Sequence, residues 1–216
     1  MNWGRKVFVN ETAKKIIKPA FLFFMHQASK LKIKQLLREK EAILLEIGAG
    51  NKKGQNGWLT MDIRRDCDLL WDLRKGIPFP DDSVCKIYSS HFFEHLSFQE
   101  GQQFLDECLR VLSPGGEFSI CVPNARLYVE AYLANTNLDE ELFFGFKPEA
   151  YNNTTKIDYL NYTAYMDGDH KYMFDENNLI HILESRGMKN VRLREFDPSI
   201  DLPERDFESI YATAVK

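Results

Sequence analysis

The sequence lacks any apolar run long enough to cross a membrane or to form the core of a secretion signal. Its longest early run, AFLFFM at residues 20–25, is far shorter than the ~20 residues of a spanning helix. It also lacks C-x-x-C spacing, since the four cysteines are Cys67, Cys85, Cys108 and Cys121. We interpret them as small buried apolar groups in a reduced compartment. These absences predict a cytoplasmic protein.

Charge is unevenly distributed along the chain. Residues 1–40 hold ten Lys or Arg against two Glu, whereas the remaining residues carry 18 basic and 30 acidic side chains. An acidic body argues against a broad nucleic-acid footprint. The basic segment contains PAFLFFMHQASKLKIKQLL at roughly helical spacing, so it could lie on an anionic membrane surface or face an anionic substrate. We favour a helix packed on the domain through Phe21, Phe24, Leu31 and Leu36, with its lysines in water.

Short apolar runs follow one another along the middle of the chain and predict buried strands: AILLEIG, GWLTMDI, CDLLWDL, SVCKIYSS and EFSICVPN. Before the fifth strand, SFQEGQQFLDECLRVL has a helical stripe, a capping box at Ser97 and Glu100, and the turn signal SPGG at its end. Residues 175–216 add a helix closed by Gly187 and two strands. The pattern predicts one open α/β sheet, mostly parallel, with an antiparallel edge.

The stretch LLEIGAGNKKGQNGWLTMD, residues 44–62, connects the first two predicted strands. In open α/β sheets, ligands bind beyond the carboxyl ends of the strands. Gly48 and Gly50 would let the main chain approach a ligand closely, and Asp62 is placed to accept hydrogen bonds from ribose hydroxyls. The stretch therefore predicts a nucleoside-containing cofactor.

The same stretch disfavours a nicotinamide dinucleotide. G-A-G-N-K-K-G is one residue too long for G-x-G-x-x-G, and only about eight residues separate Gly50 from the next apolar run, so a helix for a pyrophosphate barely fits. The sequence also has no Y-x-x-x-K pair. Glu46 suits a cationic ligand instead, and S-adenosylmethionine carries an ammonium and a sulfonium without a phosphate.

These motifs together resemble the class I S-adenosylmethionine-dependent methyltransferases, in particular the type 11-like group. LLEIGAG is similar to the first family motif and TMDI to the second, WDLRKGIPFPDDSVCKIYSSHFFEHL resembles the run from the adenine site to the active-site loop, and RVLSPGGEFSICVPN and HKYMFDENNLIHILESRGMKNVRLREF resemble the later strands and last helix. Five motifs in order are a strong signal. The resemblance covers about residues 42–216, except 125–169.

The resemblance implies a Rossmann-like methyltransferase fold: a mostly parallel seven-stranded sheet whose last strand is antiparallel, with a shortened first crossover helix. It implies a methyltransferase domain at 42–216, interrupted by an insertion at about 125–170, and the charge pattern places a basic helical segment at 1–41 before this domain. The implied cofactor is S-adenosyl-L-methionine, with S-adenosyl-L-homocysteine as product. The residues expected to bind it are Glu46, Gly48, Ala49, Gly50, Asp62, Ile63, Asp72, Leu73, Ser89 and Ser90.

The candidates for catalysis follow the fourth strand, in SSHFFEHL. A general base helps when a hydroxyl accepts the methyl group, typically by about 10²- to 10⁴-fold. His91, Glu94 and His95 are the first candidates, and Asp169 and His170 are second. HFFEH also fits the H-x-x-E-H zinc motif, but it lies before the predicted helix rather than inside one. We therefore expect no metal.

The insertion is rich in aromatic residues, with eleven in residues 125–174. We interpret it as a cap over the acceptor pocket, in which most of these rings build the cap's own core. Tyrosines beside Asn152, Asn153 and Asn161 would suit a sugar-containing or other polar small-molecule acceptor. Two alternatives stay open: a cofactor-binding partner subunit without turnover, and a nicotinamide oxidoreductase. The sequence does not distinguish O-, N- and C-methylation.

Overall fold

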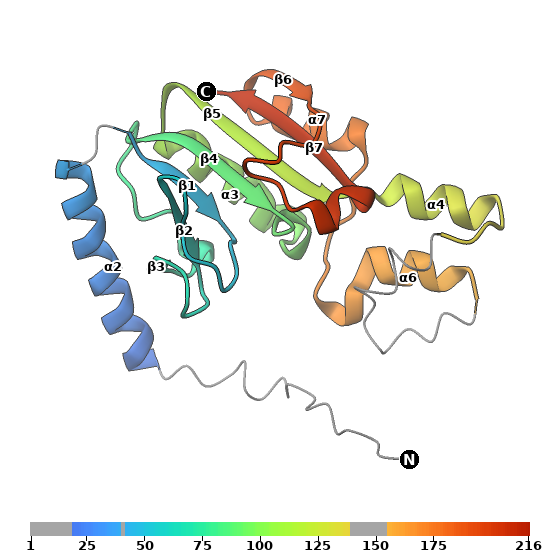
Figure 1. Cartoon of the computed structure of the whole chain (residues 1–216), viewed down its shortest axis with the longest axis horizontal. Helices are drawn as coiled ribbons and strands as arrows, with labels where there is room; N and C mark the ends of the chain where they lie inside the picture. The colour runs from blue at the N-terminus through green and yellow to red at the C-terminus, as the bar shows by residue number, and fades with distance from the viewer. Residues whose placement is uncertain (1–18, 40–41, 139–154) are drawn as a thin grey trace, which may run out of the picture.

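A computed structural model describes residues 19–39, 42–138 and 155–216, and in these ranges one seven-stranded sheet organises the chain (Figure 1). The strands lie in the order β3-β2-β1-β4-β5-β7-β6. Their bounds are β1 Leu44–Ile47, β2 Trp58–Asp62, β3 Leu69–Leu70, β4 Val84–Ser90, β5 Leu112–Pro123, β6 Lys189–Leu193 and β7 Ser209–Val215. Strands β1 to β5 pair in parallel, and β7 runs antiparallel to both β5 and β6. The predicted fold is therefore confirmed.

The central strands are buried on both faces, which is why their sequences are continuous apolar runs rather than alternating ones. Leu45, Ile47, Ile87 and Ile120 are fully inaccessible to solvent. Helices α3 (Phe98–Val111) and α7 (Glu176–Ser185) contribute to the same core. The predicted capping box begins α3, since the Ser97 hydroxyl accepts the Glu100 N–H and the Glu100 carboxylate accepts the Ser97 N–H.

The connection between β1 and β2, residues 48–57, is short as predicted, but it contains turns and no helix where the sequence predicted a shortened crossover helix. Its position is set by Asp68, whose Oδ2 accepts the backbone N–H of Gly54 at 2.8 Å and of Thr60 at 3.2 Å. One carboxylate thus ties the loop at Gly54 to strand β2 at Thr60. The strand order reverses between β1 and β4, so the ends of these two strands form the expected ligand-binding edge.

Helix α2 (Pro19–Glu39) packs beside β3 (Figure 1). It buries His26, Ser29 and Ile33, and the Ser29 hydroxyl donates to the carbonyl of Leu70 at 3.0 Å.

The prediction of which α2 residues contact the domain is wrong in part. Leu36 packs against the core as predicted, but Phe24 is 69% exposed and Leu31 68% exposed. The buried stripe recurs every three or four residues from His26, which turns Phe24 and Leu31 toward solvent. Phe21 lies outside the residues whose side chains the structure describes.

The SPGG sequence does not separate α3 from the fifth strand. Strand β5 begins directly at Leu112, and its pairing with β4 is irregular between Val84 and Lys86. Gly115 adopts a φ of 76° there, which suits glycine because it has no Cβ. The predicted turn is therefore an irregularity inside a longer strand.

The insertion forms a small helical lobe at the end of the sheet, built from α4 (Ala125–Leu133) and α6 (Ile157–Tyr165) (Figure 1). Tyr128, Tyr159 and Tyr162 are buried together in it, so these rings make the lobe's own core. We call α4, α6 and the residues packed with them the insertion lobe. Phe143, Phe144, Phe146, Tyr151, Asn152 and Asn153 lie outside the described residues.

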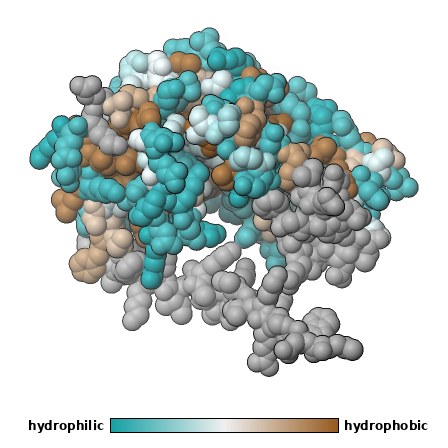
Figure 2. Space-filling view, viewed as in Figure 1, coloured by the Kyte–Doolittle hydropathy of each residue, from teal (hydrophilic) through white to brown (hydrophobic). Residues whose placement is uncertain are grey.

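Large side chains are also exposed on the surface of the insertion lobe, including Leu133 and Tyr165. On the face of the molecule that Figure 2 shows, hydrophobic residues are interspersed with hydrophilic ones. No helix in the described ranges has the length and apolar character required to span a bilayer.

Candidate active site

A cavity of about 550 Å³ opens at the carboxyl ends of β1, β2 and β4, and we call it the tip cavity. It is bounded by the β1–β2 loop, the segment after β4, the end of α6 and the segment before β7. The lining residues are Glu46, Gly48, Ala49, Gly50, Asn51, Lys52, Asp62, Arg64, Ser90, His91, Phe92, His95, Met166, Asp169, Leu202 and Arg205. Six of the ten residues predicted to bind the cofactor are among them.

Glu46 lies near the end of β1 and lines the cavity with a largely buried carboxylate. Its Oε1 lies 2.5 Å from the Lys52 Nζ. Burial raises the pKa of Glu46, and the nearby Lys52 ammonium partly offsets that rise. Glu46 therefore already binds a cationic amine from its own chain.

Asp62 ends β2 and organises the loops on either side of it. Its Oδ2 accepts the Gly50 N–H and its Oδ1 accepts the Arg64 N–H, each at 2.9 Å. A carboxylate oxygen has two lone pairs, so each still has room for a ligand hydroxyl. The arrangement holds the Asp62 carboxylate in one orientation at the cavity wall.

The two glycines of the G-A-G motif serve different purposes. Gly48 has a φ of 72°, and a Cβ there would lie 2.3 Å from the Phe92 ring. Gly50 has a φ of 66°, and a Cβ there would have no atom within 4 Å. Gly48 thus allows Phe92 to approach the strand tip, whereas Gly50 borders open space that a ligand could enter.

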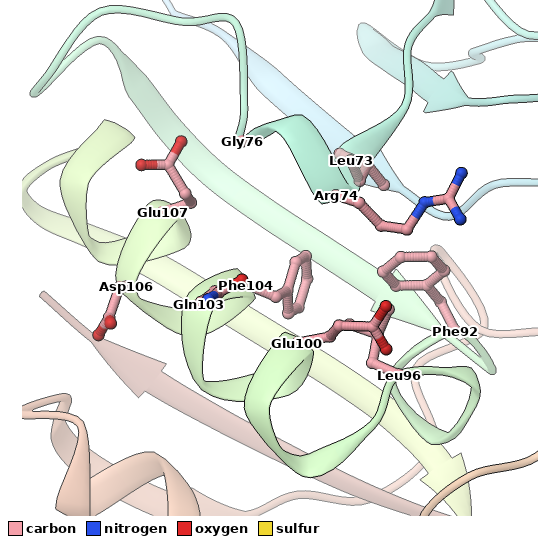
Figure 3. Close-up of a pocket in the computed structure, with 10 residues that line it drawn as sticks. All are labelled: Leu73, Arg74, Gly76, Phe92, Leu96, Glu100, Gln103, Phe104, Asp106 and Glu107. Carbon is pink, nitrogen blue, oxygen red and sulfur yellow. The ribbon is translucent and has the colours of Figure 1, made fainter.

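The other four predicted cofactor residues lie outside the lining of the tip cavity. Leu73 lines an adjoining cavity of about 300 Å³ (Figure 3), which shares Phe92 with the tip cavity. Asp72 caps the short turn Leu73–Lys75 and pairs with the Arg74 guanidinium. Ile63 is 38% exposed, and Ser89 is fully buried with no hydrogen-bond partner for its Oγ.

Figure 3 shows the adjoining cavity between the short turn after Asp72 and helix α3. Leu73, Phe92 and Phe104 give it apolar walls, and Glu100 and Arg74 extend along its edge. Apolar walls of this kind suit an aromatic base. The adenine contacts expected at Asp72 and Leu73 stay a prediction.

His91 follows β4 with a φ of 47°, a conformation uncommon for a non-glycine residue. Its N–H donates to the Cys121 carbonyl at 2.9 Å, and its Nε2 lies 2.9 Å from the Ser209 hydroxyl. Burial, followed by the charge of Arg205, lowers the pKa of His91 well below its usual value. The site therefore holds a neutral imidazole at the cavity wall.

Glu94 lies behind that wall and is fully enclosed. Neither carboxylate oxygen has a hydrogen-bond partner, and the nearest imidazole nitrogens, His91 Nδ1 and His95 Nε2, are each 3.7 Å from Oε1. Burial raises the pKa of Glu94 to about 8.

The second-rank candidates join the same cluster. The Glu94 carbonyl accepts the N–H groups of Lys171 and Tyr172, which brings His170 next to it. Ligand atoms of Glu94, His95 and His170 lie within 4.8 Å of one another. Phe93–His95 is a single 3₁₀ turn, so H-x-x-E-H is not inside an α-helix, as predicted.

Three cationic residues line the cavity in addition to the predicted site residues, and of these only Lys52 was expected near the cofactor pocket. Lys52 and Arg64 flank the two acids in sequence, and Arg205 comes from the segment before β7. The position of Lys52 in the loop after Glu46 was visible in the sequence. No motif in the sequence indicated Arg205, because only the folded sheet brings it to the same cavity as the end of β1.

Comparison with known proteins agrees with this geometry. Residues 46–120 match the family described as "Methyltransferase domain". This match covers about a third of the chain. The motif resemblance is thus confirmed over the stretch that holds both strand-tip acids and α3.

A curated relative from Mycolicibacterium smegmatis, named a probable S-adenosylmethionine-dependent methyltransferase, is 44% identical over 57 residues. That match covers 24% of this chain and 21% of the relative, so the chain spans about a fifth of that protein's length.

Two solved structures align with most of this chain at low sequence identity. A SAM-dependent methyltransferase from Archaeoglobus fulgidus is 16% identical, with a TM-score of 0.49 over 91% of this chain and 100% of that one. An S-adenosylmethionine-dependent methyltransferase from Mesorhizobium loti is 17% identical, with a TM-score of 0.49 over 89% of this chain and 100% of that one.

Proposed function

We propose that the protein transfers a methyl group from S-adenosylmethionine to a polar small-molecule or glycan-type acceptor in the tip cavity. The observation that carries this proposal is the pair of carboxylates, Glu46 and Asp62, at adjacent strand tips in one cavity. In this proposal Glu46 binds the ammonium group of the cofactor and Asp62 binds its ribose hydroxyls.

The charge of the site favours a cationic nucleoside over a dinucleotide. Glu46 binds the Lys52 ammonium at 2.5 Å, which is the chemistry that a methionine ammonium would replace. A pyrophosphate instead requires the N-terminus of a helix, and residues 48–57 contain none. The nicotinamide alternative therefore has less support.

The acceptor end of the cavity is polar. His91, His95, Asp169 and Arg205 line it. Methyl transfer from a sulfonium mainly requires alignment of two reactants, which can supply about 7–11 kcal/mol of the barrier. These side chains are placed to orient an acceptor for the transfer.

Calorimetry with S-adenosylmethionine and with NAD tests the cofactor assignment. We expect binding of S-adenosylmethionine only, and Asp62→Ala should weaken it by more than about tenfold, because the ribose and two backbone N–H groups lose their acceptor. Asp66→Ala is the matched control, since Asp66 is exposed in the same loop. Unchanged affinity in Asp62→Ala, or preferential NAD binding, would contradict the proposal.

Detection of S-adenosylhomocysteine tests turnover separately. Incubation with libraries of polyhydroxylated and sugar-containing acceptors should release it above the rate seen with cofactor alone. A protein that binds the cofactor and releases no product with any acceptor would instead be a partner subunit without turnover.

A further inference from the structure

We propose that Glu94, His95 and His170 form a binding site for a divalent transition-metal ion at the wall of the tip cavity. The three residues come from two segments 75 residues apart in the chain, and their ligand atoms lie within 4.8 Å of one another. Two imidazoles and one carboxylate are a donor set that suits zinc or ferrous iron and leaves coordination positions open.

The hydrogen bonds around the cluster fix which imidazole nitrogens can bind an ion. His95 Nδ1 lies 2.9 Å from the Asp169 carbonyl, and His170 Nδ1 lies 2.9 Å from the Thr163 carbonyl. A carbonyl oxygen only accepts, so both Nδ1 atoms carry the proton and both Nε2 atoms carry a lone pair. Metal-binding histidines typically donate their other N–H to such a carbonyl.

The tautomer of His91, which lies beside the cluster, can be assigned in the same way. The Ser209 hydroxyl donates to the Arg205 carbonyl at 2.6 Å, so it accepts from His91 Nε2 and leaves the lone pair on Nδ1. That Nδ1 lies 3.7 Å from the Glu94 carboxylate. An ionised Glu94 thus meets imidazole lone pairs where it needs a donor or a cation.

The burial of Glu94 is a second observation in favour of a bound cation, independent of the distances within the cluster. It is 2% exposed, and within residues 19–39, 42–138 and 155–216 both of its carboxylate oxygens lack a hydrogen-bond partner. An unpaired buried carboxylate is costly, and a coordinated cation is one of the few groups that would satisfy it.

The distances require little rearrangement. His95 Nε2 and Glu94 Oε1 are 3.7 Å apart. Bonds of 2.0–2.2 Å at tetrahedral angles place two ligands about 3.4 Å apart. The backbone bonds from Lys171 and Tyr172 to the Glu94 carbonyl hold the two segments in register. Because His95 also lines the tip cavity, an ion bound to it would be accessible to an acceptor oxygen.

Metal titration of the full-length, tag-free protein tests the site. The chelator-treated chain is titrated with Zn²⁺, Mn²⁺ and Mg²⁺ by calorimetry, and its retained metal is measured by plasma mass spectrometry. We expect one ion per chain, with affinity in the order Zn²⁺, Mn²⁺, Mg²⁺, since imidazole favours the later metals. His170→Gln and Glu94→Gln should each weaken Zn²⁺ binding by at least tenfold.

His181→Gln is the matched control, because His181 is exposed on α7 and should leave the affinity unchanged. Circular dichroism verifies folding, and if one cluster variant does not fold, the other decides. Absence of stoichiometric Zn²⁺ binding, or binding unchanged in a folded cluster variant, would overturn the proposal. Cofactor affinity measured in chelator reports on the proposed function separately.

Discussion

The two ends of the tip cavity differ in how completely their carboxylates are paired. At the β1–β2 end, Asp62 accepts two backbone N–H groups and Glu46 binds Lys52. Asp68, outside the cavity lining, accepts two more backbone N–H groups from the same region. At the other end, Glu94 is buried with no partner for either oxygen. The first end is organised by hydrogen bonds and an ion pair within the chain, whereas the second leaves a buried carboxyl group without a hydrogen-bond partner among the described residues.

The largest expected loss of stability comes from Gly48→Ala, because Gly48 of the β1–β2 end contacts Phe92 of the segment after β4. A Cβ there would overlap the Phe92 ring, and the residue would also keep a positive φ. Strain and overlap together should lower the free energy of unfolding by about 3 kcal/mol. Gly50→Ala has similar backbone strain but open space, so it should cost only about 1 kcal/mol. Equal losses for the two variants in denaturant unfolding would show that Phe92 does not constrain Gly48.

A pair of isosteric changes tests the comparison directly. In chelator, Glu94→Gln should raise the free energy of unfolding by about 1 kcal/mol, because an amide can donate to the imidazole lone pairs. Asp68→Asn should lower it by about 1 kcal/mol, because it loses charge-assisted bonds to the loop. Effects of the same sign would break the distinction between the two ends.

The Asp68 effect should depend on pH. Burial raises the pKa of Asp68, but hydrogen bonds from Thr60 and Gly54 outweigh burial and leave it below its usual value. The carboxylate therefore adds stability above the ordinary aspartate pKa, and this gain is lost as the pH falls through the lowered value. Wild type and Asp68→Asn should converge in stability over that acidic range, as thermal unfolding at successive pH values would measure.

The smallest expected effect is on cofactor affinity. Lys52→Gln removes the ammonium that binds Glu46, so S-adenosylmethionine would no longer compete with it. Because Lys52 is partly exposed, we expect about 1 kcal/mol, or roughly a fivefold gain in affinity by calorimetry. Lys53→Gln serves as the control, since Lys53 contacts Asp68 and the Cys67 carbonyl instead. Weaker binding in Lys52→Gln would mean that Lys52 helps to hold the cofactor.

The sheet could be predicted because its central strands are apolar on both faces and because α3 has a complete capping box. The buried face of α2 could not be predicted, because the segment has apolar residues on several sides and buries the polar His26 and Ser29. The residues predicted to bind the cofactor were chosen at strand ends, which sequence motifs mark; six of them line the tip cavity, and their cofactor contacts stay predictions. The cluster of Glu94, His95 and His170 depends on backbone bonds between distant segments, so the sequence nominated its members without showing that they meet. The catalytic roles of His91, Glu94 and His95 stay predictions.

The missing crossover helix has a consequence for how this protein can be shortened. With only a loop between β1 and β2, Ile33 of α2 fills part of the core, and Ser29 of α2 binds the edge strand β3. A fragment designed from the matched family region, residues 46–120, would leave that surface bare and would be expected to aggregate. Expression designs should therefore keep the whole helix from Pro19 onward, even if its basic character suggests a dispensable extension.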